Sequence, residues 1–285
     1  MLGACTQKSA KMTAANPKNI TVPLRAMTFN IRFEDAGTGK NSWQNRKSLV
    51  AGTMRFHDLD LIGLQEALRS QIDTLQQRLP EFNWIGVGRD DGANGGEFSP
   101  VFYRKNRLKL LRHSTFWLSE TPEIAGKMGW DAACNRVVTW GFFEDIVTGK
   151  QFYFFNTHFD HKGETARRES AKLVRRKIAE IAADYPAILV GDFNATEDTE
   201  VYQTITRKEN ITGKPLLDAF YTTQQAHYGP LASYNGFKPE DDGRRIDYIF
   251  VHPEWTIRKH AILAERFGDQ WASDHFAVIA EMELR

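Results

Sequence analysis

The sequence has few cysteines, no long hydrophobic run and almost no net charge. Cys5 and Cys134 are too few for a disulfide framework, and we expect Cys134 to be a small, inert core residue. No segment reaches the roughly 18 consecutive apolar residues that a membrane span needs. A net charge of +1 offers no global positive surface to nucleic acid, although a nuclease with a locally basic groove stays compatible with it.

The 285 residues that are present suffice for a large hydrophobic core. Residues 6–20 are polar and aperiodic, so we expect a flexible tether over residues 1–20 and a single catalytic domain over residues 21–285. The segment LGAC, residues 2–5, resembles the lipobox of a bacterial lipoprotein, although the preceding basic and apolar segments are missing. Either the sequence starts at the cleavage site or the match is chance. We expect an envelope lipoprotein tethered through a lipid on Cys5; the alternative is a cytoplasmic protein.

Hydrophobic periodicity predicts strands and helices in a mixed order. Strands are predicted at residues 22–31, 60–65, 82–88, 98–104, 107–118, 136–146, 151–157, 186–191, 246–251, 256–263 and 275–283, and helices at residues 44–57 and 163–184. A further helix carries Ile72, Leu75 and Leu79 on one face. Hairpins mixed with crossovers indicate an α+β or layered α/β fold rather than a simple doubly wound sheet.

The most informative stretch is AILVGDFNA, residues 187–195. Its apolar run is typical of a strand covered on both faces, and Asp192 and Asn194 follow it on one side of the chain. The same arrangement recurs at other strand ends, with Asn30 after RAMTF, Glu66 after DLIGLQ, Asn156, His158, Asp160 and His161 in QFYFFNTHFDH, Asp247 in RRIDYIF, and Asp274 and His275 in WASDHFAVIA. Together these residues predict one polar site at the edge of a sheet.

The motifs TFNIR, GLQEA, NTHFDH, GDFNA, RIDYIF and SDHFAV occur in the order and approximate spacing of the endonuclease/exonuclease/phosphatase superfamily. The sequence resembles this group, and its nocturnin-like branch in particular, from about residue 22 to residue 285. The resemblance implies a four-layered α/β sandwich of two packed mixed sheets with the site at one edge. It also implies a phosphoesterase that depends on a divalent metal, Mg²⁺ or Mn²⁺.

Hard oxygen ligands suit a magnesium-like ion that keeps several waters. The resemblance makes Glu66 the principal metal ligand, with Asp274 acting directly or through water. Some relatives carry an acid two residues after the strand-end asparagine, where this chain has Arg32. We therefore expect one ion rather than two.

The remaining motif residues would handle water and phosphate. By resemblance, Asp192 orients or deprotonates the attacking water, Asn194 holds that water or a phosphoryl oxygen, and Asn30 lies beside the metal and the scissile phosphate. His158 would donate to a phosphoryl oxygen. A carboxylate bonded to one imidazole nitrogen favours the charged ring, so we interpret His275 as the phosphate contact and Asp247 as the residue that orients it.

Substrate contacts are harder to predict. Arg136 opens a strand among apolar residues and could clamp phosphate. For Arg104, Arg244 and Arg245 the sequence favours a phosphate contact and an ordinary surface arginine equally. Among the aromatic residues that could stack on a base, Phe237 and Trp271 are the preferred candidates. Asp160 and His161 could bind a ligand or substrate, or simply solvate a loop.

Three functional hypotheses follow. The first is a metal-dependent phosphodiesterase or phosphomonoesterase, with a nucleotide or nucleic-acid substrate favoured and no protein partner implied. The second is a membrane-anchored hydrolase of lipid or inositol-phosphate headgroups, which the lack of an apolar, bilayer-dipping hairpin weakly disfavours. The third is a non-catalytic binding protein on this fold, which the complete set of expected site residues disfavours.

Overall fold

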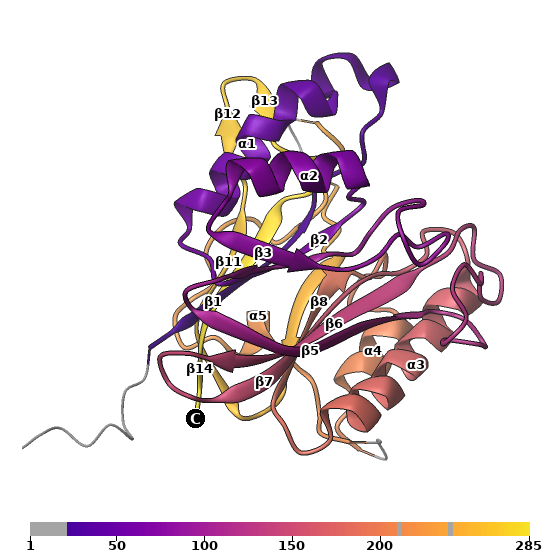
Figure 1. The fold of residues 1–285 in the computed structure, drawn as a ribbon, viewed down its shortest axis with the longest axis vertical. Helices are drawn as coiled ribbons and strands as arrows, with labels where there is room; N and C mark the ends of the chain where they lie inside the picture. The colour runs from indigo at the N-terminus through magenta and orange to yellow at the C-terminus, as the bar shows by residue number, and fades with distance from the viewer. Residues whose placement is uncertain (1–21, 210–212, 239–241) are drawn as a thin grey trace, which may run out of the picture.

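The computed structural model describes residues 22–209, 213–238 and 242–285. Two six-stranded mixed sheets pack face to face between outer helices (Figure 1). The first sheet has the order β11 (Trp255–Leu263), β14 (Ala277–Leu284), β1 (Leu24–Asn30), β2 (Leu61–Gln65), β4 (Val101–Arg104), β3 (Phe82–Ile85). The second has the order β5 (Leu108–Trp117), β6 (Val137–Asp145), β7 (Gln151–His158), β8 (Ala187–Asp192), β10 (Asp247–Val251), β9 (Leu217–Asp218).

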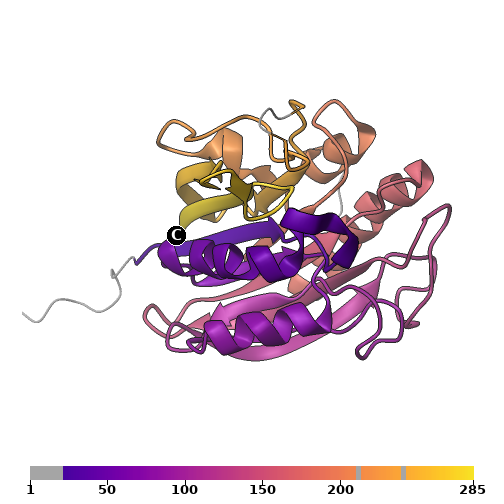
Figure 2. The ribbon, with the colours of Figure 1, turned by 90° about the horizontal axis from the view of Figure 1, so that it is seen from above.

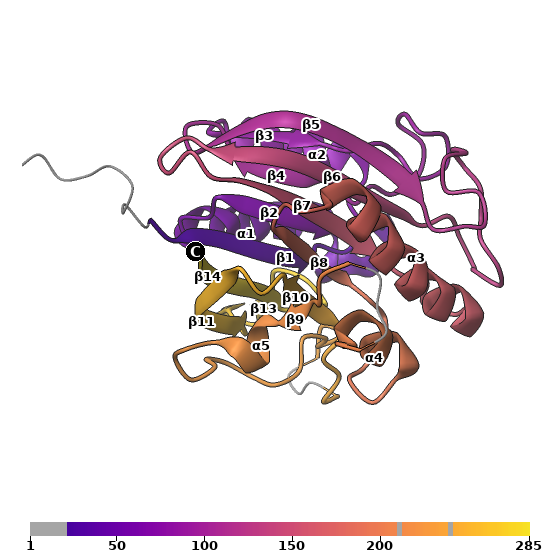
Figure 3. The same ribbon diagram turned by 90° about the horizontal axis from the view of Figure 1, so that it is seen from below.

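Helices cover the outer face of each sheet. Seen from above, α1 (Trp43–Phe56) and α2 (Arg69–Arg78) lie over the first sheet (Figure 2). Seen from below, α3 (Glu164–Ala182) and α4 (Glu200–Thr206) lie over the second (Figure 3). This arrangement confirms the expected four layers.

Three hydrophobic cores hold the layers together, and strand alternation assigns residues to them. Met27 and Phe29 of β1 face outward and pack with α1 and α2, whereas Leu24 and Ala26 face the second sheet. In the second sheet, Leu189 packs on the α3 side in the third core. Each central strand is therefore buried on both faces, which explains its nearly continuous apolar sequence.

The space between the sheets changes from apolar to polar along the strands. On β1 the face that carries Leu24 and Ala26 continues with Thr28 and Asn30, all buried. On β8 the same face runs from Ile188 through Val190 to Asp192. The polar ends lie at one edge of the sandwich, so a buried polar site forms there between the two sheets.

Gly63 allows the two sheets to approach closely beside this site. A Cβ atom at this position would lie 2.6 Å from both Asn156 Oδ1 and Val190 Cγ2 of the opposite sheet. Asn156 in turn donates hydrogen bonds to the carbonyls of Leu64 and Pro100 at 2.8 and 2.9 Å. A glycine is thus required where the second sheet inserts an amide into the first.

The long periodic elements agree with the sequence predictions to within a few residues. The sequence did not reveal the shortest ones, namely the 3₁₀ segment Ala36–Asn41, α4, α5 (Ala219–Thr222), β9, β12 (Arg266–Phe267) and β13 (Gln270–Trp271). Elements of this length contain too few residues to display a period.

The expected tether and Cys5 lie outside the described residues. Over the described ranges, no helix combines the length and the apolar character that crossing a membrane requires.

Candidate active site

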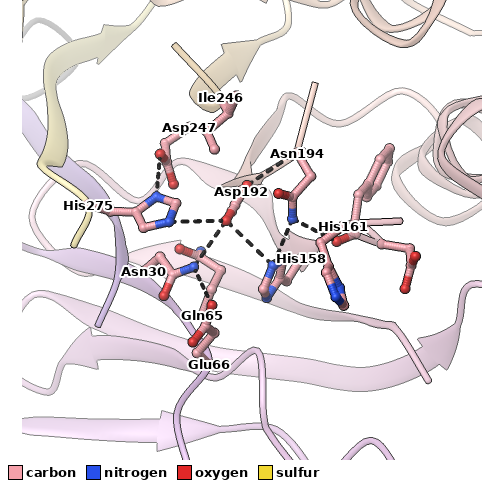
Figure 4. A network of polar contacts seen from close by, with 12 residues as sticks. Asn30, Gln65, Glu66, His158, His161, Asp192, Asn194, Ile246, Asp247 and His275 are labelled. Atoms are coloured by element: carbon pink, nitrogen blue, oxygen red, sulfur yellow. Dashed lines mark hydrogen bonds and ion pairs between the residues drawn. The ribbon is translucent and has the colours of Figure 1, made fainter. Parts of the chain in front are cut away.

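Three neighbouring strands of the second sheet bring His158, Asp192 and Asp247 into one row. Asp192 pairs with His158 of the parallel strand β7 and with Asp247 of the antiparallel strand β10. Residues in register on adjacent strands point to the same face. All three side chains are buried and face the first sheet, with Asp192 at the centre of the network (Figure 4).

Asn30 connects this row to the first sheet. Its Nδ2 donates to Asp192 Oδ2 at 3.0 Å and to Glu66 Oε1 at 3.1 Å, and its Oδ1 accepts from the backbone N–H of Arg32. Glu66 follows β2 in the left-handed conformation, with φ 59°. This costly conformation ends the strand alternation and turns the Glu66 carboxylate toward Asn30.

His275 lies between two carboxylates. Its Nδ1 donates to Asp247 Oδ2 at 2.9 Å, and its Nε2 lies 3.7 Å from Asp192 Oδ2. Burial disfavours the charged ring, but Asp247 and Asp192 outweigh it and raise the pKa of His275 to about 10. Burial and then the charge of Asp247 raise the pKa of Asp192 to about 7. Asp192 can therefore gain and lose a proton near neutral pH, as a general base must.

Asn194 and His158 complete the surroundings of Asp192. Asn194 adopts φ 47°, and its backbone N–H donates to Asp192 Oδ1 at 2.9 Å. Its Nδ2 donates to Phe159 O and to His158 Nε2, at 3.1 and 3.0 Å. Burial and the nearby Arg136 lower the pKa of His158 well below its usual value. His158 is thus a neutral acceptor at Nε2 here, so the predicted donation to a phosphoryl oxygen would first require this contact to be replaced.

Two sets of side chains in the site can hold a cation. Asp192, Asp247 and His275 form a buried group whose ligand atoms lie within 4.8 Å of one another, which fits a metal site. The carboxylates of Glu66 and Asp274 form the second set. Arg32 lies between them, with Nη1 3.6 Å from Glu66 and Nε 3.9 Å from Asp274. Burial raises the pKa of Asp274, and the charge of Glu66 adds to this effect. Two neighbouring carboxylates that attract one arginine, Asp274 buried and Glu66 partly exposed, are suited to a metal ion.

These residues open into one cleft of about 400 Å³. It is lined by Arg32, Phe33, Glu66, Arg89, Glu97, Cys134, Arg136, His158, His161, Asp192, Asn194, Tyr234, Arg244, Ile246, Asp274 and His275. The volume lies in the range of small-molecule sites.

The model of the endonuclease/exonuclease/phosphatase family matches residues 27–275, the segment that carries every residue of this network. The chain belongs to the endonuclease/exonuclease/phosphatase family. It is accordingly a metal-dependent phosphoesterase, and its buried Asp/Asp/His group fits a metal site typical of that family.

Solved structures of the same family resemble this chain closely. A Bacteroides vulgatus family protein has 43% sequence identity and a TM-score of 0.88, covering 93% of this chain and 100% of that one. A mannosyl-6-phosphatase of Bacteroides thetaiotaomicron has 34% identity and a TM-score of 0.85, covering 91% and 99%. Human nocturnin is 26% identical over 92% of this chain, but the match spans 65% of nocturnin's own length.

The family motifs account for the centre of the site, and their eight predicted residues converge there. Of the four predicted substrate contacts, only Arg136 lines the cleft. Arg104 ends β4, which runs antiparallel to β2, so it lies beside Asp60 at the opposite edge and donates to Leu59 O at 2.8 Å. Its expected placement at the site was wrong.

Phe237 and Trp271 do not line the cleft either. The guanidinium of Arg46 lies 5.3 Å from the centre of the Phe237 ring. Trp271 packs edge-on against Phe276 and donates its indole N–H to Lys238 O at 3.1 Å. The aromatic residues that do reach the cleft are Phe33 and Tyr234.

One wall of the cleft was missed by sequence reasoning. Arg89 and Glu97 come from a glycine-rich loop between β3 and β4, a segment without strand or helix periodicity. Asp160 is not a solvated loop residue but a buried one, which accepts backbone N–H bonds from Ala133, Lys162 and Gly163. His161, next to it, lines the cleft.

Proposed function

We propose that this family member is a Mg²⁺-dependent phosphomonoesterase that acts on a small sugar phosphate. The observation that carries the proposal is a cleft of about 400 Å³ that is lined by His158, Asp192 and His275 and also by the guanidinium groups of Arg32 and Arg244. A cleft of this size suits a small ligand, and guanidinium groups suit the dianionic terminal phosphate of a monoester. The 34% identity to a mannosyl-6-phosphatase supports a sugar phosphate in particular.

Glu66 and Asp274 would hold the ion, directly or with water between. We prefer them to the buried Asp/Asp/His group because His275 is hydrogen-bonded to Asp247 and its raised pKa favours the protonated ring, which cannot bind a metal. One Mg²⁺ ion, with Mn²⁺ as the substitute, would neutralise negative charge on the phosphoryl oxygens. Arg32 would then be released from the two carboxylates to face the phosphate.

Asp192 would take the proton of the water that attacks phosphorus, while the bond from phosphorus to the sugar oxygen breaks on the opposite side; the sugar oxygen leaves with the bonding electron pair and takes a proton from solvent. Its pKa of about 7 suits this task. The backbone N–H of Asn194 and the side chain of Asn30 fix the Asp192 carboxylate from two directions. Charged His275, oriented by Asp247, would bind a phosphoryl oxygen and stabilise the negative charge of the transition state.

A nucleotide or nucleic-acid 3′ end is the second candidate. The ring of Tyr234 lines the cleft, and the Arg244 guanidinium lies 4.5 Å from its centre. A base could stack on this pair. The matches to nocturnins support the idea, although the chain spans 65% or less of the fruit-fly and human proteins.

A lipid or inositol-phosphate headgroup is the remaining alternative, linked to the proposed lipid anchor on Cys5. Metabolic labelling with a radioactive fatty acid, compared between wild type and Cys5→Ser, tests the anchor. Unlabelled wild-type protein would end the envelope proposal.

A substrate panel tests the proposed reaction. Phosphate release from mannose 6-phosphate, glucose 6-phosphate, p-nitrophenyl phosphate, inositol phosphates and AMP is measured beside cleavage of bis(p-nitrophenyl) phosphate, oligo(A), duplex DNA and sphingomyelin. We expect the hexose 6-phosphates to have the highest kcat/KM, and Asp192→Ala to lose turnover while it keeps its melting temperature. Preferred cleavage of oligo(A) or of the diester would refute the monoesterase proposal.

A further inference from the structure

The cleft has a polar wall that the hydrolytic residues do not use. It consists of Arg89, Glu97, Arg136 and His161, which come from the β3–β4 loop, the segment before β6, and the loop after β7. In Figure 4, His161 lies on the far side of His158 from His275. The wall is therefore displaced from the Asp247–His275 side of the site.

Arg136 is an almost fully buried cation of this wall. Its side chain is 5% exposed; Nε forms an ion pair with Asp160 Oδ2 at 3.6 Å without a hydrogen bond, and Nη1 has no hydrogen-bond partner among the described residues. Nη2 donates to His161 Nδ1 at 3.1 Å. Burial and Arg136 lower the pKa of His161, which leaves its ring neutral with the hydrogen on Nε2. A buried guanidinium that lacks part of its acceptors is costly, and an oxygen atom of a ligand in the cleft would add one.

Arg89 and Glu97 face each other across a tight loop. Arg89 Nη1 donates to Glu97 Oε2 at 2.6 Å, and Arg89 Nε is buried without a hydrogen-bond partner in the described ranges. The loop is closely packed, because a Cβ on Gly88 would lie 2.3 Å from the Gly95 carbonyl oxygen. The indole of Trp117 also donates to Arg89 O at 2.7 Å. The pair is thus held in place before any ligand arrives.

The charges of the wall indicate what it binds. Arg89 and Arg136 carry two positive charges, which Glu97 and the carboxylate of Asp160 behind Arg136 balance. Although burial opposes it, hydrogen bonds from Gly163, Lys162 and Ala133 lower the pKa of Asp160 to about 2, so Asp160 stays charged. A second phosphate or carboxylate would find no net positive charge here. Neutral hydroxyl groups, which donate and accept, match guanidinium groups set beside a carboxylate acceptor.

We infer that this wall is the subsite for the sugar, binding neighbouring hydroxyl groups of the leaving alcohol through Arg89 with Glu97 and through Arg136 with His161. The inference rests on the proposed phosphomonoesterase function. It assigns phosphate and sugar to different residues, so the two can be perturbed separately.

Two substrates of the same enzyme test the subsite. The hexose 6-phosphate of highest turnover carries hydroxyls, whereas p-nitrophenyl phosphate presents the same phosphate on an aromatic leaving group without them. We expect Glu97→Gln to lower kcat/KM for the hexose phosphate about 10- to 100-fold and to change p-nitrophenyl phosphate hydrolysis less than threefold. Glu180→Gln, the same substitution on the exposed face of α3, should change neither. The 2-deoxy analogue of the hexose phosphate should lose part of the wild-type preference.

The outcomes separate the two proposals. No hydrolysis of p-nitrophenyl phosphate by wild type would refute the phosphomonoesterase itself. The sugar subsite alone would be refuted if wild type hydrolyses p-nitrophenyl phosphate but Glu97→Gln loses kcat/KM equally on both substrates. The same holds if Glu97→Gln loses no kcat/KM on either substrate. Should Glu97→Gln fail to fold by circular dichroism, Arg89→Lys provides the same comparison, because an ammonium cannot keep the Glu97 contact and also reach the ligand.

Discussion

Replacing Asp247 by asparagine should lower the pKa of His275 and so favour the neutral ring. The Asp247 carboxylate is fully buried, and its Oδ2 accepts the Nδ1–H of His275 at 2.9 Å. Two unit charges about 4 Å apart interact by about 4 kcal/mol at an effective dielectric constant of about 20. Because about 1.4 kcal/mol corresponds to one pH unit, the substitution should lower the pKa of His275 by about three pH units, from its present value of about 10 toward neutrality.

The pKa can be measured directly in metal-free protein. Ring ¹⁵N chemical shifts recorded between pH 5 and pH 10 report the protonation of each histidine, and Asp269→Asn, at a side chain 86% exposed, serves as the control. At pH 9 a ring with a pKa of about 7 would be almost entirely neutral while the wild-type ring stays mostly charged, so kcat at this pH should fall by about 10²-fold, comparable to removal of one transition-state donor. A wild-type His275 that titrates at or below the usual pKa of 6.5, or a titration unchanged by Asp247→Asn, would refute the reasoning.

Three further perturbations probe the base, the sheet contact and the support of the site. Because burial raises the pKa of Asp192 to about 7, kcat/KM should fall as pH drops below that value and the base becomes protonated; a flat profile between pH 5 and pH 8 would exclude Asp192 as the base. Gly63→Ala should lower the free energy of unfolding by about 1–3 kcal/mol, measured by urea titration, because its Cβ would overlap the opposite sheet; an unchanged midpoint would mean that the sheets separate easily. Arg46 is fully buried and donates to the carbonyls of Ile31 and Ala272 at 2.8 and 2.7 Å. Arg46→Lys should therefore lower the free energy of unfolding by about 2–6 kcal/mol and weaken Mn²⁺ binding measured by calorimetry. Wild-type Mn²⁺ affinity in the folded variant would contradict the supporting role of Arg46.

The centre of the site could be predicted because it follows from strand alternation. Asn30 and Asp192 continue faces that begin with buried apolar residues, so alternation places both side chains between the sheets, and the family motifs predicted that they meet in one site. Glu66 and Asn194 follow their strands in left-handed conformations, which no hydrophobic pattern reveals, yet their position next to a strand end was enough to locate them.

The walls of the cleft could not be predicted, because they depend on strand direction and loop folding. Arg104 ends a strand as Asp192 does, but β4 runs antiparallel to β2 of the same sheet and carries Arg104 to the far edge. Trp271 is three residues from Asp274, but its indole is directed to Lys238 and Phe276. Conversely, Arg89 has no neighbour in the sequence that suggests a site, and only the folded loop brings it to the cleft.

Phosphate release from hexose 6-phosphate, with and without Mg²⁺, tests the central claim most directly when wild type is compared with Glu66→Gln. The account predicts release that requires the ion and falls at least 10²-fold in the variant, while the melting temperature without metal stays unchanged. Release that is equal in wild type and Glu66→Gln, or no release from any phosphate ester with any divalent ion, would contradict it.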